Sequence, residues 1–291
     1  MYPPRLSLKC RNNIRSHTMI SIFLQAGLGN QFFQIYTAIA YAMEHNEKLV
    51  IPEYKWDSDK RPSYWESIFN RLKPAIDPNL KPGSLVRLKE EGFHYTPLPK
   101  KTKVILFGYF QSYKYFDKHA EAISKKLNIR MEQEMIKTKY CTLKETISLH
   151  FRIGDYMDVQ LQHPLLSDKY YSDAIAEIIK RTKKSDWNII YFCEEKDNAP
   201  VNQRLRKIKK RFPDLSFFKA PDTMQDWEQL LLMSCSDHNI IANSTFSWWG
   251  AYLNRNPDKL ICYPQTWFGL LNAHLITKDL CPPSWISIQA S

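Results

Sequence analysis

Apolar, β-prone runs alternate with helical patterns throughout the second half of the chain. The β-prone runs cover residues 147–151, 188–193, 215–218, 238–242 and 259–263. The segments between them show the 3.6-residue apolar spacing of helices at 168–183, 204–212, 223–235 and from about Phe246. A helix returns the chain to the start of the sheet before the next strand, so strands joined in this way run parallel. The alternation therefore predicts a parallel α/β sheet with 259–263 as its last strand.

The first half opens with a strand, a glycine-bearing loop and a helix. The strand is expected at 19–24, the loop at 25–30 and the helix from Gln31, with a second strand at 48–51. Such a unit can hold a phosphate at the helix N-terminus. Phe32 occupies the third glycine position of the G-x-G-x-x-G pattern, so the loop alone is weak evidence for nucleotide binding.

The rest of the first half indicates a division into domains. A further strand is expected at 103–110 and a helix at 114–126, while the polar segment 128–142 is either a bridge or another helix. A chain of 291 residues is long enough for two domains. We expect an N-terminal domain at 19–140 and a C-terminal domain at 141–291. Residues 1–18 are basic and polar, and we expect them to form a disordered extension.

The charge of the chain favours an anionic partner. The formal net charge is +11 and the pI is about 9.2, which suits a phosphorylated small molecule, a nucleic acid or an acidic surface. The helix expected at 204–212 has a basic face that could contact nucleic acid, although a solvated face is the commoner case. No partner class is selected by charge alone.

The cysteines and the apolar runs bear on the cellular compartment. The six cysteines form no C-x-x-C pair and no metal-binding cluster, which indicates small buried side chains in a reducing compartment. No run approaches the roughly 20 apolar residues of a membrane span, and residues 1–18 lack the apolar core of a signal peptide. These features favour a cytoplasmic enzyme.

Polar side chains gather where the strand at 147–151 ends. His150, Arg152, Gly154 and Asp155 follow one another there, and ligands of open α/β sheets bind beyond the carboxyl ends of strands. The guanidinium of Arg152 is a planar fork of donors that suits a phosphate, and Gly154 permits a turn or a close approach to a ligand. The alternative is an ion pair between Arg152 and Asp155 that fastens a loop.

A second polar stretch, Asn243-Ser244-Thr245, separates the strand at 238–242 from the next helix. Its amide and hydroxyl groups beside a positive helix end can bind an anion, or they can simply cap the helix. Trp248 and Trp249 follow. They indicate core packing first, and stacking on a base or a sugar second.

Residues 54–70 combine aromatic and polar side chains, including Tyr64 and Trp65. Aromatic faces of this kind suit a sugar acceptor, but they also pack loops. Asp57 and Asp59 have the D-x-D spacing that can hold a divalent cation with a nucleotide diphosphate. They follow no apolar strand, so a solvated loop is the favoured interpretation.

Three motifs in this order resemble the α-1,2-fucosyltransferases of glycosyltransferase family 11. They are G-L-G-N-Q at 27–31, H-F-R-I-G-D-Y at 150–156 and N-S-T-F-S-W-W-G at 243–250, with support from F-G-Y-F-Q-S-Y-K-Y-F at 107–116 and Y-P-Q-T-W-F at 263–268. The resemblance extends from about residue 19 to 270. It implies two Rossmann-like domains facing a cleft (GT-B type), GDP-fucose as the donor, inversion at the anomeric carbon, and neither a metal nor another cofactor.

The resemblance also implies roles for the matched residues. Arg152 would stabilise the charge that grows on the departing diphosphate. His150 would contact phosphate or ribose, or orient Arg152. Asp155 is either the base for the acceptor hydroxyl or the ion-pair partner of Arg152. The residues expected to bind GDP-fucose are Gly27, Gly29, Asn30, Gln31, His150, Arg152, Gly154, Asn243, Ser244, Thr245, Phe246 and Ser247.

The chain departs from the family pattern in two places. Cys193-Glu194-Glu195 stands where the family often has Ser-Asp-Asp, so Glu194 and Glu195 either contact guanine or belong to a solvated loop. Ile153 stands where a second arginine is common.

The expected activity is transfer of fucose to the 2-hydroxyl of a galactose-terminated glycan, without nucleic acid as a partner. The alternatives are a fucosyltransferase of another linkage and a non-catalytic binder of nucleotides or nucleic acid.

Overall fold

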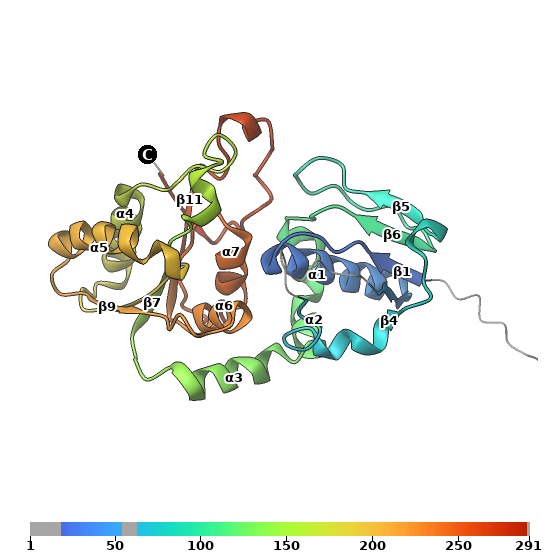
Figure 1. Ribbon diagram of the computed structural model, residues 1–291, viewed down its shortest axis with the longest axis horizontal. Helices are drawn as coiled ribbons and strands as arrows, with labels where there is room; N and C mark the ends of the chain where they lie inside the picture. Colours follow the sequence, from blue (N-terminus) through green and yellow to red (C-terminus); the bar gives the residue numbers. More distant parts are fainter. Residues whose placement is uncertain (1–18, 54–62, 290–291) are drawn as a thin grey trace, which may run out of the picture.

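The computed structural model describes residues 19–53 and 63–289. These residues form two α/β units that lie side by side, with helices α1 (Leu28–His45) and α7 (Thr245–Tyr252) packed against each other between the two sheets (Figure 1). Each unit is built on a parallel sheet, as the strand–helix alternation predicts. The two-unit α/β architecture is that of a GT-B type protein.

The N-terminal unit contains a four-stranded sheet in the order β2-β1-β6-β5. Its strands are β1 (Met19–Ile22), β2 (Lys48–Leu49), β5 (Val86–Lys89) and β6 (Val104–Phe107), all parallel. A separate pair joins β3 (Ile51–Pro52) to β4 (Ile76–Asp77). Helix α1 begins at Leu28, earlier than the expected start at Gln31.

The C-terminal unit contains a six-stranded parallel sheet in the order β12-β11-β10-β7-β8-β9. Its strands are β7 (Thr146–His150), β8 (Asn188–Phe192), β9 (Ser216–Lys219), β10 (His238–Ile240), β11 (Ile261–Pro264) and β12 (Ile286–Ile288). The chain runs outward from β7 to β9, returns to β10 and runs outward again to β12. This is the Rossmann strand order, whose ligand crevice opens where the direction reverses, between β7 and β10.

One strand expectation is wrong. The run at 259–263 is not the last strand, because β12 pairs with β11 through Cys262 and Ile286. Strand β12 is a three-residue segment after a long irregular stretch, so the sequence around it shows no alternation.

The remaining helices cover the sheets or connect the units. They are α2 (Ala120–Lys126), α3 (Ile129–Tyr140), α4 (Asp168–Thr182), α5 (Asn198–Arg211) and α6 (Asp226–Ser234). Short 3-10 turns occur at Asn70–Ala75, Pro82–Ser84, Tyr113–Tyr115, Asp117–His119, Gly154–Met157, Glu195–Asp197 and Leu270–Asn272. Within the described part of the chain, no helix has the length and apolarity needed to cross a bilayer.

The segment 128–142, expected to be either a bridge or another helix, contains helix α3, which also connects the two units. It follows the N-terminal sheet in the chain and precedes β7, and in Figure 1 it extends from α2 to lie below the C-terminal unit. The Gln133 side-chain amide donates to Ser234 Oγ at 2.8 Å and to the Leu253 carbonyl at 2.9 Å. These buried hydrogen bonds fasten the connection to the C-terminal unit.

One aromatic core joins the two units. Trp248 and Trp249 are completely buried. The Trp249 ring centroid lies 5.0 Å from that of Phe32, 4.5 Å from that of Tyr36 and 5.2 Å from that of Phe116. The core-packing interpretation of both tryptophans is confirmed, and stacking on a ligand is ruled out because neither ring reaches the surface.

The burial of the cysteine side chains agrees only in part with the expectation that they are buried. Cys193, Cys262 and Cys281 are buried, whereas Cys141 and Cys235 are partly exposed; all five are free thiols. Cys10 lies outside the described residues.

Candidate functional site

A cavity of about 900 Å³ lies over the carboxyl ends of β7 and β10, at the reversal point of the C-terminal sheet. Residues of both units line it. The N-terminal unit supplies residues 26–30, Tyr64, Phe93, Tyr109 and Gln111, and the C-terminal unit supplies the segments after β7, β8, β9, β10 and β11. The strand order thus places the cavity where a parallel sheet of this type binds its ligand.

The N-termini of α1 and α7 meet in the cavity wall. A Cβ atom on Gly29 would lie 2.6 Å from the Phe246 amide nitrogen, closer than real Cβ atoms come. Only glycine therefore allows the first turns of the two helices to touch. The unpaired N–H groups of a first helical turn carry partial positive charge, so two such turns together favour an anion.

Most of the residues predicted in the glycine loop and the second polar stretch line this cavity. Those that do are Gly27, Gly29, Asn30, Asn243, Ser244, Thr245 and Phe246. Ser244 is the N-cap of α7, with its hydroxyl accepting from the Phe246 amide at 3.4 Å. Asn243 uses its side-chain amide to hold two loops, donating to the Pro164 and Trp267 carbonyls. Capping and anion binding are thus compatible here, because the backbone amides remain beside the cavity.

Three predicted residues lie behind the cavity wall. The Gln31 side chain donates to the Ala26 carbonyl at 3.0 Å and braces the loop before α1. Ser247 is buried, and its hydroxyl accepts from the Ala242 amide at 3.2 Å. Gly154 has a φ of +26°, and its amide donates to Asp197 at 2.8 Å. Their geometry positions neighbouring groups, and a direct contact with the donor stays a prediction.

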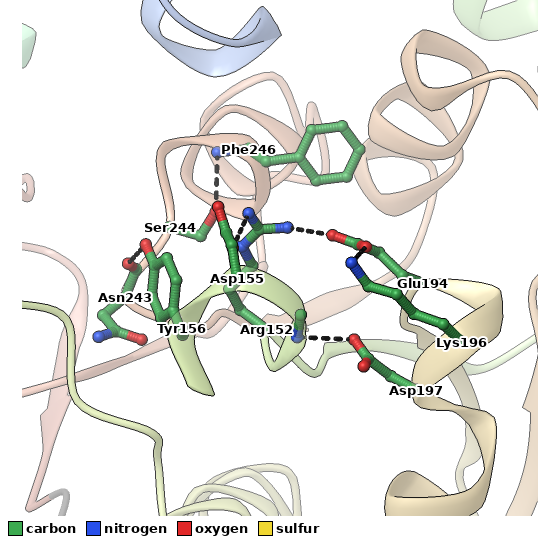
Figure 2. A network of polar contacts seen from close by, with 10 residues as sticks. Arg152, Asp155, Tyr156, Glu194, Lys196, Asp197, Asn243, Ser244 and Phe246 are labelled. Atoms are coloured by element: carbon green, nitrogen blue, oxygen red, sulfur yellow. Dashed lines mark hydrogen bonds and ion pairs between the residues drawn. The ribbon is translucent and has the colours of Figure 1, made fainter. Parts of the chain in front are cut away.

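Arg152 lies in the cavity between two carboxylates. One terminal nitrogen of its guanidinium donates to Glu194 Oε1 at 2.6 Å and the other pairs with Asp155 (Figure 2). The guanidinium also lies over the ring of Tyr156, 5.1 Å from its centroid. The expected pairing of Asp155 with Arg152 is therefore present, and the role of Asp155 as a base stays a prediction.

The side chains that contact Arg152 are themselves held in place by hydrogen bonds and ion pairs. The Tyr156 hydroxyl donates to the Asn243 carbonyl at 3.0 Å, which joins the segments after β7 and β10, and burial raises the pKa of Tyr156 to about 12. Burial alone would raise the pKa of Glu194, but Lys196 and Arg152 hold it below its usual value. Glu194 is therefore an ionised partner of Arg152 rather than a free solvated side chain.

His150 is a neutral group at neutral pH. Its side chain is buried, and its Nδ1 atom has no hydrogen-bond partner among the described residues. Burial and the nearby charge of Arg152 lower the pKa of His150 to about 3. A neutral imidazole beside an arginine can bind a ligand hydroxyl or phosphate without adding charge.

The buried histidine should make the protein less stable in mild acid. Because the pKa of His150 is lowered on folding, the unfolded chain binds more protons below about pH 6.5. Stability is therefore lost as the pH falls from 6.5 toward 3, by up to about 1.4 kcal/mol per pH unit. Replacing His150 with Asn should reduce this slope, measured by urea unfolding at pH 7.5 and pH 5. The exposed His274→Asn variant is the control, and equal slopes in wild type and His150→Asn would contradict the expectation.

The predicted acceptor region is described in part. Tyr54, Trp56, Asp57, Asp59 and Arg61 lie outside the described residues, as does the extension expected at 1–18. Tyr64 lines the cavity and donates a hydrogen bond to Asp226 of the C-terminal unit. Trp65 packs against Phe69. The described residues contain no group of three or more His, Cys, Asp or Glu side chains placed to hold a metal, and independence from metal stays a prediction.

Sequence reasoning missed several cavity residues. They are Tyr109, Gln111, Asp226, Gln229, Trp267, Phe268 and Asn272. Gln111 carries a usable signal, since it follows a β-prone run, and its amide donates to Asn30 Oδ1 at 2.7 Å. Asp226 and Gln229 belong to a helix whose start the sequence places three residues too early, so nothing marked them as cavity residues.

The basic face of α5 is partly neutralised by α4. Lys207 pairs with Asp168 at 2.9 Å, and Arg211 pairs with Asp173 at 3.1 Å. Such pairs reduce the positive field that a nucleic acid would meet. The observation favours the interpretation of α5 as a solvated helix.

Comparison with known proteins identifies the family. The model of glycosyl transferase family 11 matches residues 13–288. The chain belongs to this family. The glycosyltransferase class predicted from the three motifs is thereby confirmed.

Named relatives of this family 11 glycosyltransferase differ in the sugar that they transfer. An α-1,2-colitosyltransferase of Escherichia coli is 28% identical, with 91% of this chain and 97% of the relative covered. A galactoside 2-α-L-fucosyltransferase of Caenorhabditis elegans is 22% identical, with 94% and 80% covered. A mutant of Arabidopsis thaliana FUT1, solved in complex with GDP, is 13% identical with a TM-score of 0.46, and 84% and 70% of the two chains are covered.

Proposed function

We propose that this protein transfers fucose from GDP-fucose to the 2-hydroxyl of a terminal sugar on a glycan, with galactose as the expected acceptor. The transfer inverts the anomeric carbon and needs no metal. The observation that carries the proposal is the position of Arg152, which lies in the same cavity as the converging N-termini of α1 and α7. This is a site for a diphosphate, and family membership supplies the sugar-transfer chemistry.

The geometry suggests how the residues divide the reaction. The bond between the anomeric carbon and the phosphate oxygen breaks, and negative charge grows on the departing GDP. Arg152 and the two helix N-termini stabilise that charge, since preorganised donors act most strongly where charge develops. The acceptor 2-hydroxyl forms the new bond from the opposite face, and its proton passes to a base, for which Asp155 is our candidate.

The N-terminal wall of the cavity is the expected acceptor side. Tyr64, Phe93 and Tyr109 present aromatic faces there, and Gln111 presents an amide. Aromatic rings beside polar groups suit sugar rings.

The cytoplasmic location expected from the sequence is part of this proposal, since GDP-fucose must be supplied on the same side of the membrane as the enzyme.

A GDP-linked colitose is the second candidate donor. The observation that favours it is the 28% identity to a colitosyltransferase over nearly the full length of both chains. Colitose differs from fucose in lacking the 3-hydroxyl. A site that hydrogen-bonds this hydroxyl rejects the deoxy sugar strongly, whereas an apolar site discriminates weakly.

The proposal is tested by incubating the protein with GDP-fucose or GDP-colitose and galactose-terminated glycans in the presence of EDTA. Mass and linkage analysis of the products is expected to show fucose on the 2-hydroxyl. A product that contains colitose but no fucose would identify GDP-colitose as the donor. Attachment of the sugar at another hydroxyl would show that the enzyme forms a different linkage. If neither donor supports transfer, the proposed function is wrong.

The Lys207→Ala variant is a control for the nucleic-acid alternative. Lys207 lies on the basic face of α5 and is not part of the cavity wall. Transfer should be unchanged in this variant. A protein that acted by binding nucleic acid through α5 would instead lose that binding and show a shallower salt dependence.

A further inference from the structure

Residues 108–111, here named the wall segment, follow strand β6 and form part of the N-terminal wall of the cavity. Tyr109 and Gln111 line the cavity, and Phe110 between them is completely buried. Phe110 has a φ of +54°, a left-handed conformation that is strained for a bulky side chain and persists only where other contacts compensate. The wall segment therefore needs support from another part of the fold.

Glu90 supplies support from the neighbouring strand. Strands β5 and β6 run parallel and side by side, and Glu90 and Gly108 are the first residues after each, at the same edge of the sheet (Figure 1). The Glu90 carboxylate accepts from the Tyr109 backbone N–H at 2.8 Å, and the Phe110 N–H also favours its ionised form. Successive N–H groups of a turn make a concavity that favours an anion, and here a carboxylate of the same chain occupies it.

The glycine at position 108 leaves room for this carboxylate. A Cβ atom there would lie 2.4 Å from Glu90 Cβ and 2.7 Å from Glu90 Oε2, closer than real Cβ atoms come. Helix α1 also holds the segment, because the Gln34 side-chain amide donates to the Gly108 carbonyl at 3.3 Å. The backbone of the wall segment is thus in close contact with both Glu90 and α1.

The carboxylate of Glu90 acts through backbone contacts and not through an ion pair. Within the described part of the chain no lysine, arginine or histidine pairs with it. Burial raises the pKa of Glu90, and the Tyr109 and Phe110 N–H groups only partly offset this effect. Glu90 itself does not line the cavity. A carboxylate that is costly to bury therefore acts on the cavity only by way of the segment that it holds.

The wall segment extends to the site assigned to the diphosphate. The Gln111 side-chain amide donates to Asn30 Oδ1 at 2.7 Å, beside the N-terminus of α1. The Ser112 N–H donates to the Phe110 carbonyl at 2.8 Å and closes a tight turn around Gln111. An acceptor bound to this wall would lie close to the bond that breaks, and small displacements of reacting groups lower transfer rates strongly.

We propose that Glu90 is a positioning residue for the acceptor. It holds the backbone of the wall segment so that the Tyr109 ring and the Gln111 amide meet the acceptor sugar in one arrangement. The inference rests on the proposed function, because it takes the N-terminal wall as the acceptor side. The donor half of the reaction, which Arg152 and the two helix N-termini serve, does not depend on Glu90.

The inference is tested by measuring two reactions of the full-length protein with GDP-fucose. The first is transfer to a galactose-terminated glycan, with the acceptor varied at saturating donor. The second is hydrolysis without acceptor, in which water attacks the anomeric carbon, the bond to the phosphate oxygen breaks, and fucose, GDP and a proton are formed. Hydrolysis uses the donor half alone.

Glu90→Ala should lower kcat/KM for the acceptor by about tenfold or more, mainly through KM. The segment would then occupy several arrangements, and the apparent affinity for the acceptor falls with the fraction that is competent to bind. The rate of hydrolysis and the Kd for GDP, measured by calorimetry, should stay within about twofold of wild type, because the donor half is unchanged.

Three further variants separate positioning from folding. Glu90→Gln keeps a carbonyl oxygen that can accept from the Tyr109 N–H, so it should recover most of the lost kcat/KM. Gly108→Ala leaves the carboxylate but displaces it, so it should reproduce the loss. Glu91→Ala removes the next carboxylate, which is exposed, and should behave as wild type. Thermal melts show whether each variant is folded.

The outcomes are distinct. Wild-type kinetics toward the acceptor in folded Glu90→Ala overturns the inference and leaves the proposed function intact. An equal loss of transfer and hydrolysis means that Glu90 supports the whole fold, and it also overturns the inference, as does a Glu90→Gln variant that recovers nothing. If the wild type transfers fucose to no galactose-terminated glycan, the proposed function is wrong and the inference fails with it.

Discussion

Replacing Arg152 with alanine is expected to lower kcat by about 10³-fold, because one preorganised donor at the developing charge contributes that much. The variant keeps the N-termini of α1 and α7, so GDP should still bind, although more weakly. It also leaves Glu194 and Asp155 without their shared guanidinium. Initial rates with GDP-fucose at saturating acceptor measure kcat, and calorimetry measures GDP binding.

Two variants sharpen this expectation. Arg152→Lys retains the positive charge but cannot form two parallel hydrogen bonds, so its rate should lie between those of wild type and alanine. Arg181→Ala removes an exposed arginine whose ion pair within the described part of the chain is with Glu177, and it should leave the rate unchanged. A kcat within about threefold of wild type in Arg152→Ala would contradict the role assigned to the guanidinium, since such a change is under 1 kcal/mol.

The strands and the strand-end motifs were predictable because their signals are local. The C-terminal strands β7 to β11 each coincide with an apolar run, and His150 ends β7 while Arg152 lies two residues further along the chain. The parallel sheet then brings Arg152 and Asn243 to one edge without further information. The order of strands was not predictable in this way, since it depends on pairing between distant segments.

The cavity residues that were not predicted from the sequence are brought to the cavity by tertiary packing. Asp226 and Gln229 reach it through the position of α6, which follows β9 in the chain. Conversely, Ser247 lies inside a predicted motif but is buried behind the cavity wall, where its hydroxyl accepts a hydrogen bond from the Ala242 amide. A motif marks a segment, whereas the side of the helix decides which of its residues can touch a ligand.

The role of Gly29 changes between sequence and structure. A glycine loop before a helix suggests that the backbone approaches a phosphate. The structure shows that Gly29 lets α1 approach α7, and the anion site arises because two helix N-termini then lie together. The contact between helices from different units could not be inferred from the loop alone.

Replacing Trp249 with alanine is expected to destabilise the protein by about 3–5 kcal/mol, the usual cost of removing a large aromatic side chain from a core. Trp249 is completely buried and packs against Phe32 and Tyr36 of α1 as well as Phe116. The loss should affect both units at once, because the tryptophan lies in the core that joins them. Urea unfolding followed by circular dichroism and by fluorescence measures the change.

Trp249→Phe is the matched variant. It keeps an aromatic ring and removes an indole N–H that has no partner among the described residues, so its cost should be under about 1.5 kcal/mol. In both variants the two probes should report one transition, since a shared core couples the units. Two separate transitions, of which only one shifts in Trp249→Ala, would show that each unit is stabilised by its own core. In that case the cavity between them would depend on the contact of α1 with α7 at Gly29 rather than on the aromatic cluster.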